Sequence, residues 1–139
     1  TEYSGTPYAT LAALTLARVN IEDDELSAAQ SHLQWVLDNT KSDIMRDMAR
    51  LRMARVLLAM DNPDGAQAIL DQAPPLSSYD ALYSEMHGDI EFARGDTVAA
   101  NKAYQSALAA TDNASPGRHL LQLKYDSTLV AASAAGDVE

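Results

Sequence analysis

The sequence predicts an all-α solenoid built from stacked helical hairpins. One spacing occurs three times in the 139 residues: a small residue, an alanine twelve positions later, and a large apolar residue four positions after that. The copies begin 37 and 34 residues apart, a period typical of repeated helix pairs. Only 6% of the residues are aromatic, which suits close-packed helices better than a sheet core. The positions are Ala17, Ala29 and Leu33; Ala54, Ala66 and Leu70; and Gly88, Ala100 and Tyr104.

The first predicted hairpin, 7–39, consists of helices over 7–21 and 25–39. Thr6 is expected to cap the first helix, and the proline that follows it suits the first helical position, where its missing N–H is not needed. An acidic turn joins the helices, and either Asp23 or Asp24 is expected to cap the second one.

The second predicted hairpin, 42–73, begins with a helix that Ser42 opens and that runs to about residue 60. This helix is apolar on more than one face, as expected for a helix packed between two neighbours. Asn62 is expected to cap the next helix, which covers 63–73 and ends at Pro74-Pro75.

The third predicted hairpin, 78–111, starts at Ser77 or Ser78. Gly95 is suited to the left-handed conformation that ends its first helix, and Asp96 is suited to cap its second helix. The short turns within these hairpins make the paired helices antiparallel.

A seventh helix, over 116–133, is expected to cover the apolar end of the stack, as terminal repeats require. Three antiparallel hairpins and this capping helix account for the whole length, so 1–139 is predicted to be a single domain. The sequence begins at Thr1 rather than Met, which leaves room for an upstream segment, including a membrane anchor.

Composition excludes several classes of function. The formal net charge of −10 argues against nucleic-acid binding and against anionic membrane surfaces, because both need clustered Lys and Arg. The absence of cysteine removes disulfides, thiolate catalysis and cysteine-ligated zinc. No run approaches the roughly 18 apolar residues that would span a bilayer.

The sequence predicts no enzyme, metal site or cofactor. The three histidines, His32, His87 and His119, lie on different predicted helices, and none has metal-binding spacing. An enzymatic alternative would need a deep pocket that gathers His87, Glu85 and Asp89. An arginine of the third helix is expected to pair with these two carboxylates instead.

A candidate protein-binding groove follows from the repeat geometry, because the first helix of each stacked hairpin lines the concave surface. Its apolar positions and flexible methionine suit varied peptide segments, while its arginines can bind carboxylates through two parallel hydrogen bonds. The groove residues are Leu11, Leu14 and Arg18; Met48, Leu51, Arg52, Arg55 and Leu58; and Leu82, Glu85, Asp89 and Phe92.

Other interpretations stay open for several of these residues. The apolar character of four residues would also suit a position in the helix-packing core instead of a ligand surface; these are Met45, Met48, Leu51 and Phe92. Arg46 and Arg50 are near enough to pair with Asp43 and Asp47, as in an ordinary solvated helix face. Trp35 suits either an exposed interface anchor or a partly buried packing position.

The clearest copy of the spacing, from Gly88 through Gly95-Asp96 and Ala100 to Tyr104, resembles the tetratricopeptide repeat. Longer stretches between Tyr8 and Leu129 resemble the periplasmic tetratricopeptide-like domain of the YfgM-like ancillary subunits of the bacterial Sec translocon. These stretches are Leu33-Gln34-Trp35-Val36-Leu37-Asp38-Asn39, Ala49-Arg50-Leu51-Arg52-Met53-Ala54-Arg55-Val56-Leu57-Leu58-Ala59, His87-Gly88-Asp89-Ile90 and Leu121-Gln122-Leu123-Lys124-Tyr125-Asp126.

The resemblance implies an inner-membrane protein with a single span and a helical domain in the periplasm. It also implies association with the SecYEG channel and with a membrane-anchored periplasmic chaperone of the prolyl-isomerase type. The expected function is that of an adaptor or accessory chaperone for exported polypeptides. A general tetratricopeptide scaffold of another complex is the alternative.

Overall fold

The structure is a computed structural model that describes residues 6–73 and 80–136. Within these ranges the chain forms seven helices and no strand, which confirms the predicted all-α fold. The helices belong to two compact units, Thr1–Pro75 and Leu76–Glu139. Repeats of a solenoid contact mainly their neighbours, so two units are compatible with a single domain, and that assignment stays a prediction.

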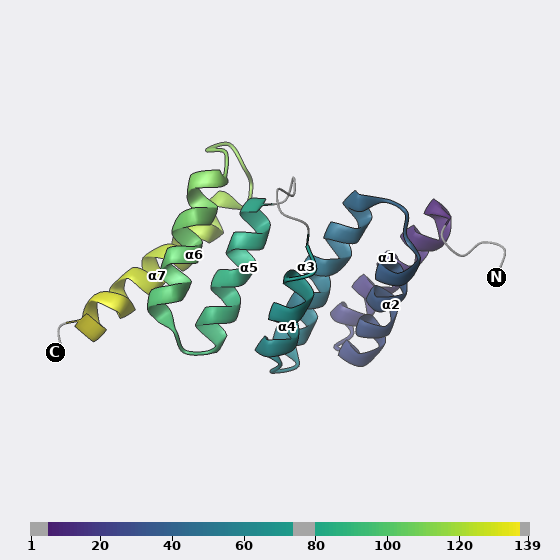
Figure 1. The fold of residues 1–139 in the computed structure, drawn as a ribbon, viewed down its shortest axis with the longest axis horizontal. Helices are drawn as coiled ribbons and strands as arrows, with labels where there is room; N and C mark the ends of the chain where they lie inside the picture. Colours follow the sequence, from purple (N-terminus) through teal and green to yellow (C-terminus); the bar gives the residue numbers. More distant parts are fainter. Residues whose placement is uncertain (1–5, 74–79, 137–139) are drawn as a thin grey trace. The chain divides into compact units, whose positions relative to one another are not determined.

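Unit 1 contains two helical hairpins. The first comprises α1 (Pro7–Glu22) and α2 (Leu26–Asn39), and the second comprises α3 (Asp43–Ala59) and α4 (Pro63–Leu70). Each helix packs against the next, and α1 also contacts α3 (Figure 1). Buried residues cover more than one face of α3, as expected for a helix packed between two neighbours, whereas Met48 and Arg52 are half-buried and Arg55 is exposed on its remaining face.

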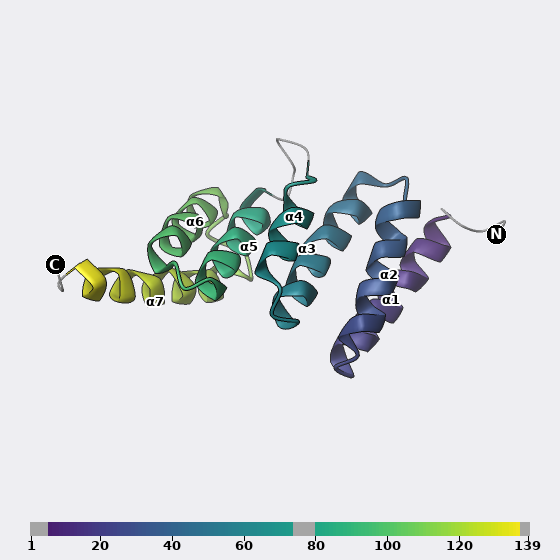
Figure 2. The same cartoon turned by 60° about the horizontal axis from the view of Figure 1, so that its bottom comes forward.

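Unit 2 contains one hairpin, α5 (Asp80–Ala93) and α6 (Thr97–Ala110), followed by α7 (Arg118–Gly136). Figure 2 shows α7 beside this hairpin, and its contacts are mainly with α6. The Arg118 guanidinium donates to the carbonyls of Leu108 and Thr111, both at 2.9 Å, and so satisfies the carboxyl end of α6.

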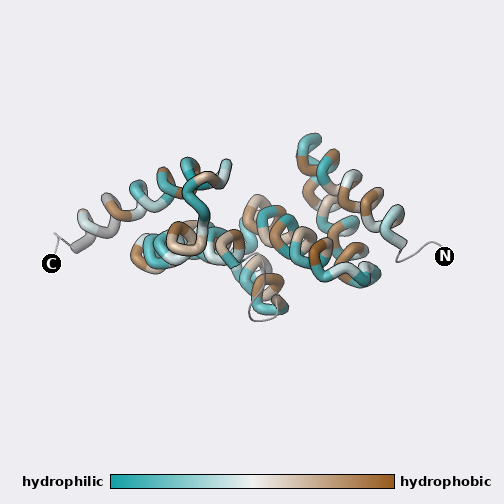
Figure 3. The backbone as a smooth tube through the Cα atoms, turned by 90° about the horizontal axis from the view of Figure 1, so that it is seen from above, coloured by the Kyte–Doolittle hydropathy of each residue, from teal (hydrophilic) through white to brown (hydrophobic). Residues whose placement is uncertain are grey.

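The repeated spacing forms the helix-packing core, because all nine of its residues are buried. In unit 2 the core cluster consists of Ala100, Tyr104, Ala107 and Leu121. Figure 3 shows hydrophobic and hydrophilic residues alternating along the helices, which is typical of elements that bury one stripe and expose the other.

The three hairpins turn in the same way. Asp24, Asp61 and Gly95 have φ values of 60°, 59° and 85°, and each lies seven residues after the small residue of its repeat. A left-handed residue at this point reverses the chain between antiparallel helices. The predicted left-handed conformation of Gly95 is therefore confirmed.

Four predicted helix caps are confirmed by hydrogen bonds from the backbone of the first turn. The caps of α1, α3, α4 and α6 are Thr6, Ser42, Asn62 and Asp96, which accept at 3.2, 3.3, 2.9 and 3.0 Å, respectively.

The cap expected for α2 is wrong. Its N-cap is Glu25, which makes no capping hydrogen bond with its side chain. Asp24 is occupied by the left-handed turn, and the Glu25 carboxylate accepts instead from the Asn20 amide at 2.8 Å. Asp24 therefore adopts the left-handed conformation that the turn requires and does not cap α2.

Two predicted helices, those corresponding to α4 and α7, differ from the structure by more than one residue at an end. The helix α4 ends at Leu70 rather than at residue 73. After Leu70 the amides of Gln72 and Ala73 donate to the carbonyls three residues before them, at 3.3 and 3.0 Å, so the chain continues as a tighter turn instead of an α-helix. Pro74-Pro75 and the predicted start at Ser77 or Ser78 lie outside the described residues. The helix α7 begins at Arg118, two residues later than expected, and extends to Gly136.

Candidate protein-binding site

Five of the predicted groove residues line one hollow in unit 1, between α1 and α3. The hollow has a volume of about 210 Å³ and is called the α1–α3 hollow below. No acidic side chain is among its lining residues, which are Leu11, Leu14, Thr15, Arg18, Met48 and Arg52.

The α1–α3 hollow has an apolar floor and an exposed rim. Leu14 is only 4% exposed, whereas Leu11 is 51% exposed and Met48 is half-buried. Leu51 is buried beside α3's other core residues, which favours its interpretation as a core residue. Leu58 is half-buried and does not line the hollow.

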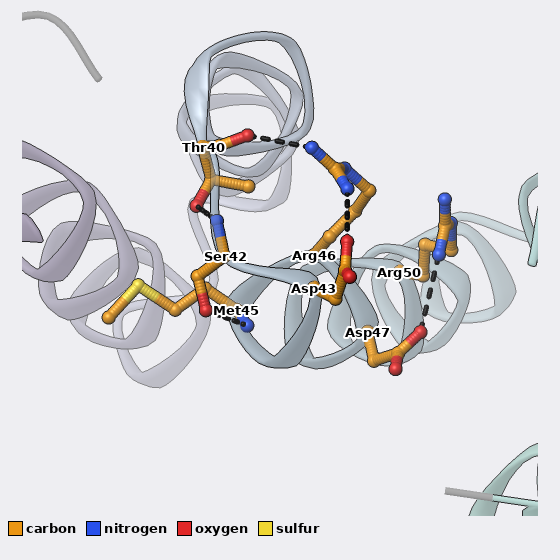
Figure 4. A network of polar contacts seen from close by, with 7 residues as sticks. All are labelled: Thr40, Ser42, Asp43, Met45, Arg46, Asp47 and Arg50. Atoms are coloured by element: carbon orange, nitrogen blue, oxygen red, sulfur yellow. Dashed lines mark hydrogen bonds and ion pairs between the residues drawn. The ribbon is translucent and has the colours of Figure 1, made fainter. Parts of the chain in front are cut away.

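Two arginines of α3 make contacts that stabilise the folded chain. Figure 4 shows Arg46 donating to Asp43 at 2.8 Å and to the Thr40 carbonyl at 2.7 Å, so it ties α3 to the turn before it. Arg50 pairs with Asp47 at 3.2 Å, and both side chains are about nine-tenths buried. These contacts confirm the two predicted ion pairs, but the Arg50–Asp47 pair is buried rather than on the solvated helix face that was expected. Both arginines therefore stabilise the fold.

Three other arginines on the candidate groove are available to a ligand. Among the described residues, the side chains of Arg18, Arg52 and Arg55 have no ion pair and no hydrogen bond. Arg18 and Arg55 are exposed, and Arg52 is half-buried at the wall of the hollow. In a chain with net charge −10, these positive groups form an unusual local surface.

The predicted carboxylates of α5 have a different partner from the one expected. The Lys124 ammonium, on α7, lies 3.2 Å from Glu85 Oε1 and 3.1 Å from Asp89 Oδ2. The cation is therefore Lys124 and not the expected arginine of the third helix. The cation comes from α7 because that helix packs along the same hairpin as α5.

Tyr104 completes this polar cluster. Its hydroxyl donates to Asp89 Oδ1 at 2.7 Å, and Lys124 lies 6.0 Å above its ring. Burial, together with the hydrogen bond and negative charge of Asp89 and the charge of Glu85, raises the pKa of Tyr104 far above its ordinary value. Tyr104 therefore stays a protonated hydrogen-bond donor near neutral pH.

The remaining predicted groove residues, Leu82 and Phe92, are exposed on α5. Phe92 borders a hollow of about 220 Å³ together with Asp89, Tyr104 and Lys124. A second hollow, of about 270 Å³, is lined partly by Leu82 and Glu85. Neither of them gathers the set that the enzymatic alternative requires.

The remaining candidates are the tryptophan, possible metal ligands and possible membrane-spanning helices. Trp35 is half-buried on α2, which favours its packing interpretation. No group of three or more His, Cys, Asp or Glu side chains that could hold a metal ion occurs among the residues described. Within the same residues, no helix is both long enough and apolar enough to cross a bilayer.

Comparison with known families decides the family of this chain. The sequence model of the tetratricopeptide repeat-like domain matches residues 1–129. The chain belongs to this family. No solved structure is significantly similar to it.

The chain is also homologous to curated proteins that share the name ancillary SecYEG translocon subunit. The protein from Neisseria gonorrhoeae is 35% identical over 116 residues, which are 84% of this chain and 55% of the relative. The Haemophilus influenzae protein is 31% identical over 75% of this chain and 50% of its own length. The Escherichia coli protein is 28% identical over 73% of this chain and 48% of its own length. This chain thus spans about half the length of these relatives.

Proposed function

We propose that this tetratricopeptide-like chain is a non-catalytic protein-interaction domain that acts at the Sec translocon. The observation that carries the proposal is its similarity to several proteins named ancillary SecYEG translocon subunit. The all-α repeat fold supports it, because stacked helical hairpins form extended surfaces for partner proteins.

The proposed role is that of an adaptor or accessory chaperone for exported proteins. Its partners are SecYEG, a membrane-anchored periplasmic chaperone of the prolyl-isomerase type, and exported polypeptides. The domain lies on the periplasmic side of the bacterial inner membrane. These finer assignments rest on the family resemblance of the sequence.

The candidate groove residues are the proposed contact surface. In unit 1 the α1–α3 hollow supports this assignment, since it combines apolar lining residues with arginines that have no partner among the residues described. In unit 2, taken by itself, the proposed contact residues Leu82 and Phe92 are exposed on α5. Aromatic and arginine side chains are enriched at the centres of protein interfaces.

Site-specific crosslinking in cells tests this function. A photoreactive residue is placed at Met48 or at Phe92 in the full-length protein, and crosslinked partners are identified after irradiation. We expect recovery of SecYEG components from both positions. A photoreactive residue at Ser31, which is exposed on α2, serves as the control and should give little of this product.

The same experiment separates the proposal from its alternative. Reproducible crosslinks to a different complex, without SecYEG, would indicate a general tetratricopeptide scaffold and would overturn the translocon assignment. Crosslinks only to further copies of the chain would indicate an oligomer interface and would overturn the groove assignment.

A further inference from the structure

We propose that the α1–α3 hollow and the adjacent Arg55 bind an acidic amphipathic segment of a partner protein. An apolar side chain of the segment enters the hollow, and its carboxylates bind Arg18, Arg52 and Arg55. This inference rests on the proposed interaction function and specifies the chemistry of the partner.

Charge complementarity is the first argument. Arg18, Arg52 and Arg55 are three of the ten basic residues, and within the described ranges none has a side-chain partner. The neighbouring arginines of α3 are neutralised by aspartates of the same helix. A site that leaves its cations unneutralised in an otherwise acidic chain attracts acidic segments and rejects basic ones.

The repeat gives the second argument. Arg18 and Arg55 lie 37 residues apart, which is the spacing of the first two copies, so they occupy equivalent positions on α1 and α3. The equivalent position of the third copy, 34 residues on, is Asp89, and Lys124 of unit 2 neutralises it. Among the residues that the structure describes, the positive face without ion-pair partners thus belongs to unit 1.

The number of arginines indicates a run of carboxylates rather than one. A guanidinium can bind a carboxylate through two parallel hydrogen bonds, so three arginines offer more than a single terminal carboxylate can use. Arg52 and Arg55 lie one turn apart on α3, and Arg18 lies on α1. A segment with several acidic side chains satisfies this arrangement.

The hollow accounts for the apolar part of the segment. Its volume of about 210 Å³ and its lining by Leu11, Leu14 and Met48 suit an apolar side chain. Methionine is unbranched and flexible, so Met48 can adapt to side chains of different shape. The ligand is therefore amphipathic as well as acidic.

Fluorescence anisotropy with a defined probe tests the inference. The probe is a labelled synthetic peptide with leucine and glutamate at helical spacing, acetylated and amidated so that only side chains carry charge. We expect saturable binding that weakens as salt is raised, because exposed ion pairs are screened. Replacing the glutamates by lysine, or the leucines by serine, should abolish this binding.

Variants locate the site. Arg18→Gln together with Arg52→Gln should weaken binding roughly tenfold, since each exposed ion pair contributes only modestly. Lys41→Gln together with Lys102→Gln removes the same charge from exposed positions outside the hollow and should leave the affinity unchanged. Equal weakening in both double variants would show a general charge effect and overturn the site.

Three further results would overturn the assigned ligand. They are tight binding of a leucine-ended peptide that has a free terminal carboxylate but no glutamate, equal binding of a single-stranded oligonucleotide, and self-association that the arginine variant abolishes. Recovery of SecYEG by crosslinking, with no binding of the acidic peptide, would refute only this inference. Loss of the SecYEG crosslinks with intact peptide binding would refute only the translocon function.

Discussion

At the residue scale, the contact between Gly88 and Tyr104 shows how the repeat is built. Glycine inside a helix costs about 1 kcal/mol relative to alanine, so its presence on α5 requires a packing reason. A Cβ atom at Gly88 would overlap ring atoms Cδ1 and Cε1 of Tyr104 on α6. The first two copies have alanine at the small position and leucine at the large apolar position. The third copy has a smaller residue, glycine, at the first of these positions and a larger residue, tyrosine, at the second.

Substitution of Gly88 by alanine is expected to destabilise the chain. The Tyr104 ring is buried and its hydroxyl is bonded to Asp89, so moving the ring away from a new Cβ would disturb these contacts. Overpacking of a core typically costs about 1 to 3 kcal/mol, more than the helix propensity that alanine gains. Urea denaturation followed by circular dichroism measures the change. An unchanged or higher midpoint would show that the two helices separate freely at this contact.

A second substitution tests the same contact more strictly. Tyr104→Leu alone loses ring contacts and the hydrogen bond to Asp89, so it should also destabilise. Combined with Gly88→Ala it recreates the alanine and leucine of the other copies, and the double variant should be more stable than the sum of the single effects. If the two single effects on stability simply add in the double variant, the small glycine does not compensate for the large tyrosine, and this interpretation of the contact is wrong.

At the element scale, Lys124 bridges α7 to α5 through Glu85 and Asp89. The three side chains are 28%, 19% and 23% exposed, so solvent screens the ion pairs only in part. Without the ammonium, two carboxylates one turn apart on α5 would repel each other. The bridge therefore favours attachment of α7 to the hairpin.

Lys124→Met is expected to lower the free energy of unfolding by about 1 kcal/mol, in line with partly exposed ion pairs. It should also speed amide hydrogen exchange along α7. Lys102→Met, at an exposed position on α6, is the matched control and should have little effect. Adding Glu85→Gln to Lys124→Met should recover part of the loss, and no recovery would contradict the electrostatic cause.

The helices were predictable because their signals are local. Thr6, Ser42, Asn62 and Asp96 each mark a helix start through a hydrogen bond within one turn. The role of Asp24 was not predictable from capping preference alone, because aspartate suits both a cap and a left-handed turn. The repeat contained the missing signal, since Asp24 is equivalent to Gly95.

The candidate site was predictable only in part. Repeat geometry placed Leu11, Arg18 and Met48 near one another, because equivalent positions on neighbouring repeats share a face. The partner of Asp89 was missed, since the capping helix was assigned only to cover the stack. Lys124 lies 35 residues after Asp89, close to the repeat period, and this spacing was the available signal.

At the scale of the whole molecule, the net charge of −10 makes the cations that lack a partner within the described ranges important for the choice of binding partner. The acidic surface repels acidic partners in general, so a partner that binds the α1–α3 hollow must be held by local contacts with Arg52 and its neighbours. Changes to these arginines should therefore affect partner binding far more than they affect folding.

Arg52→Glu together with Arg55→Glu tests this relation between charge and function. Both side chains lack ion pairs among the described residues, so helix content and unfolding midpoint should change little. Co-purification of SecYEG with the full-length protein should fall severalfold, because two attractive contacts become repulsive. Quantitative pull-down from solubilised membranes measures the loss.

The matched control is Lys41→Glu together with Lys102→Glu, which lowers the net charge by the same four units at exposed positions outside the hollow. If both double variants lose SecYEG equally, the whole-molecule charge rather than the groove governs binding. If the arginine variant keeps its partner while remaining folded, α1 and α3 do not form the contact surface. Loss of the partner from the arginine variant alone places the contact on these two helices, because a change in total charge acts equally on both variants.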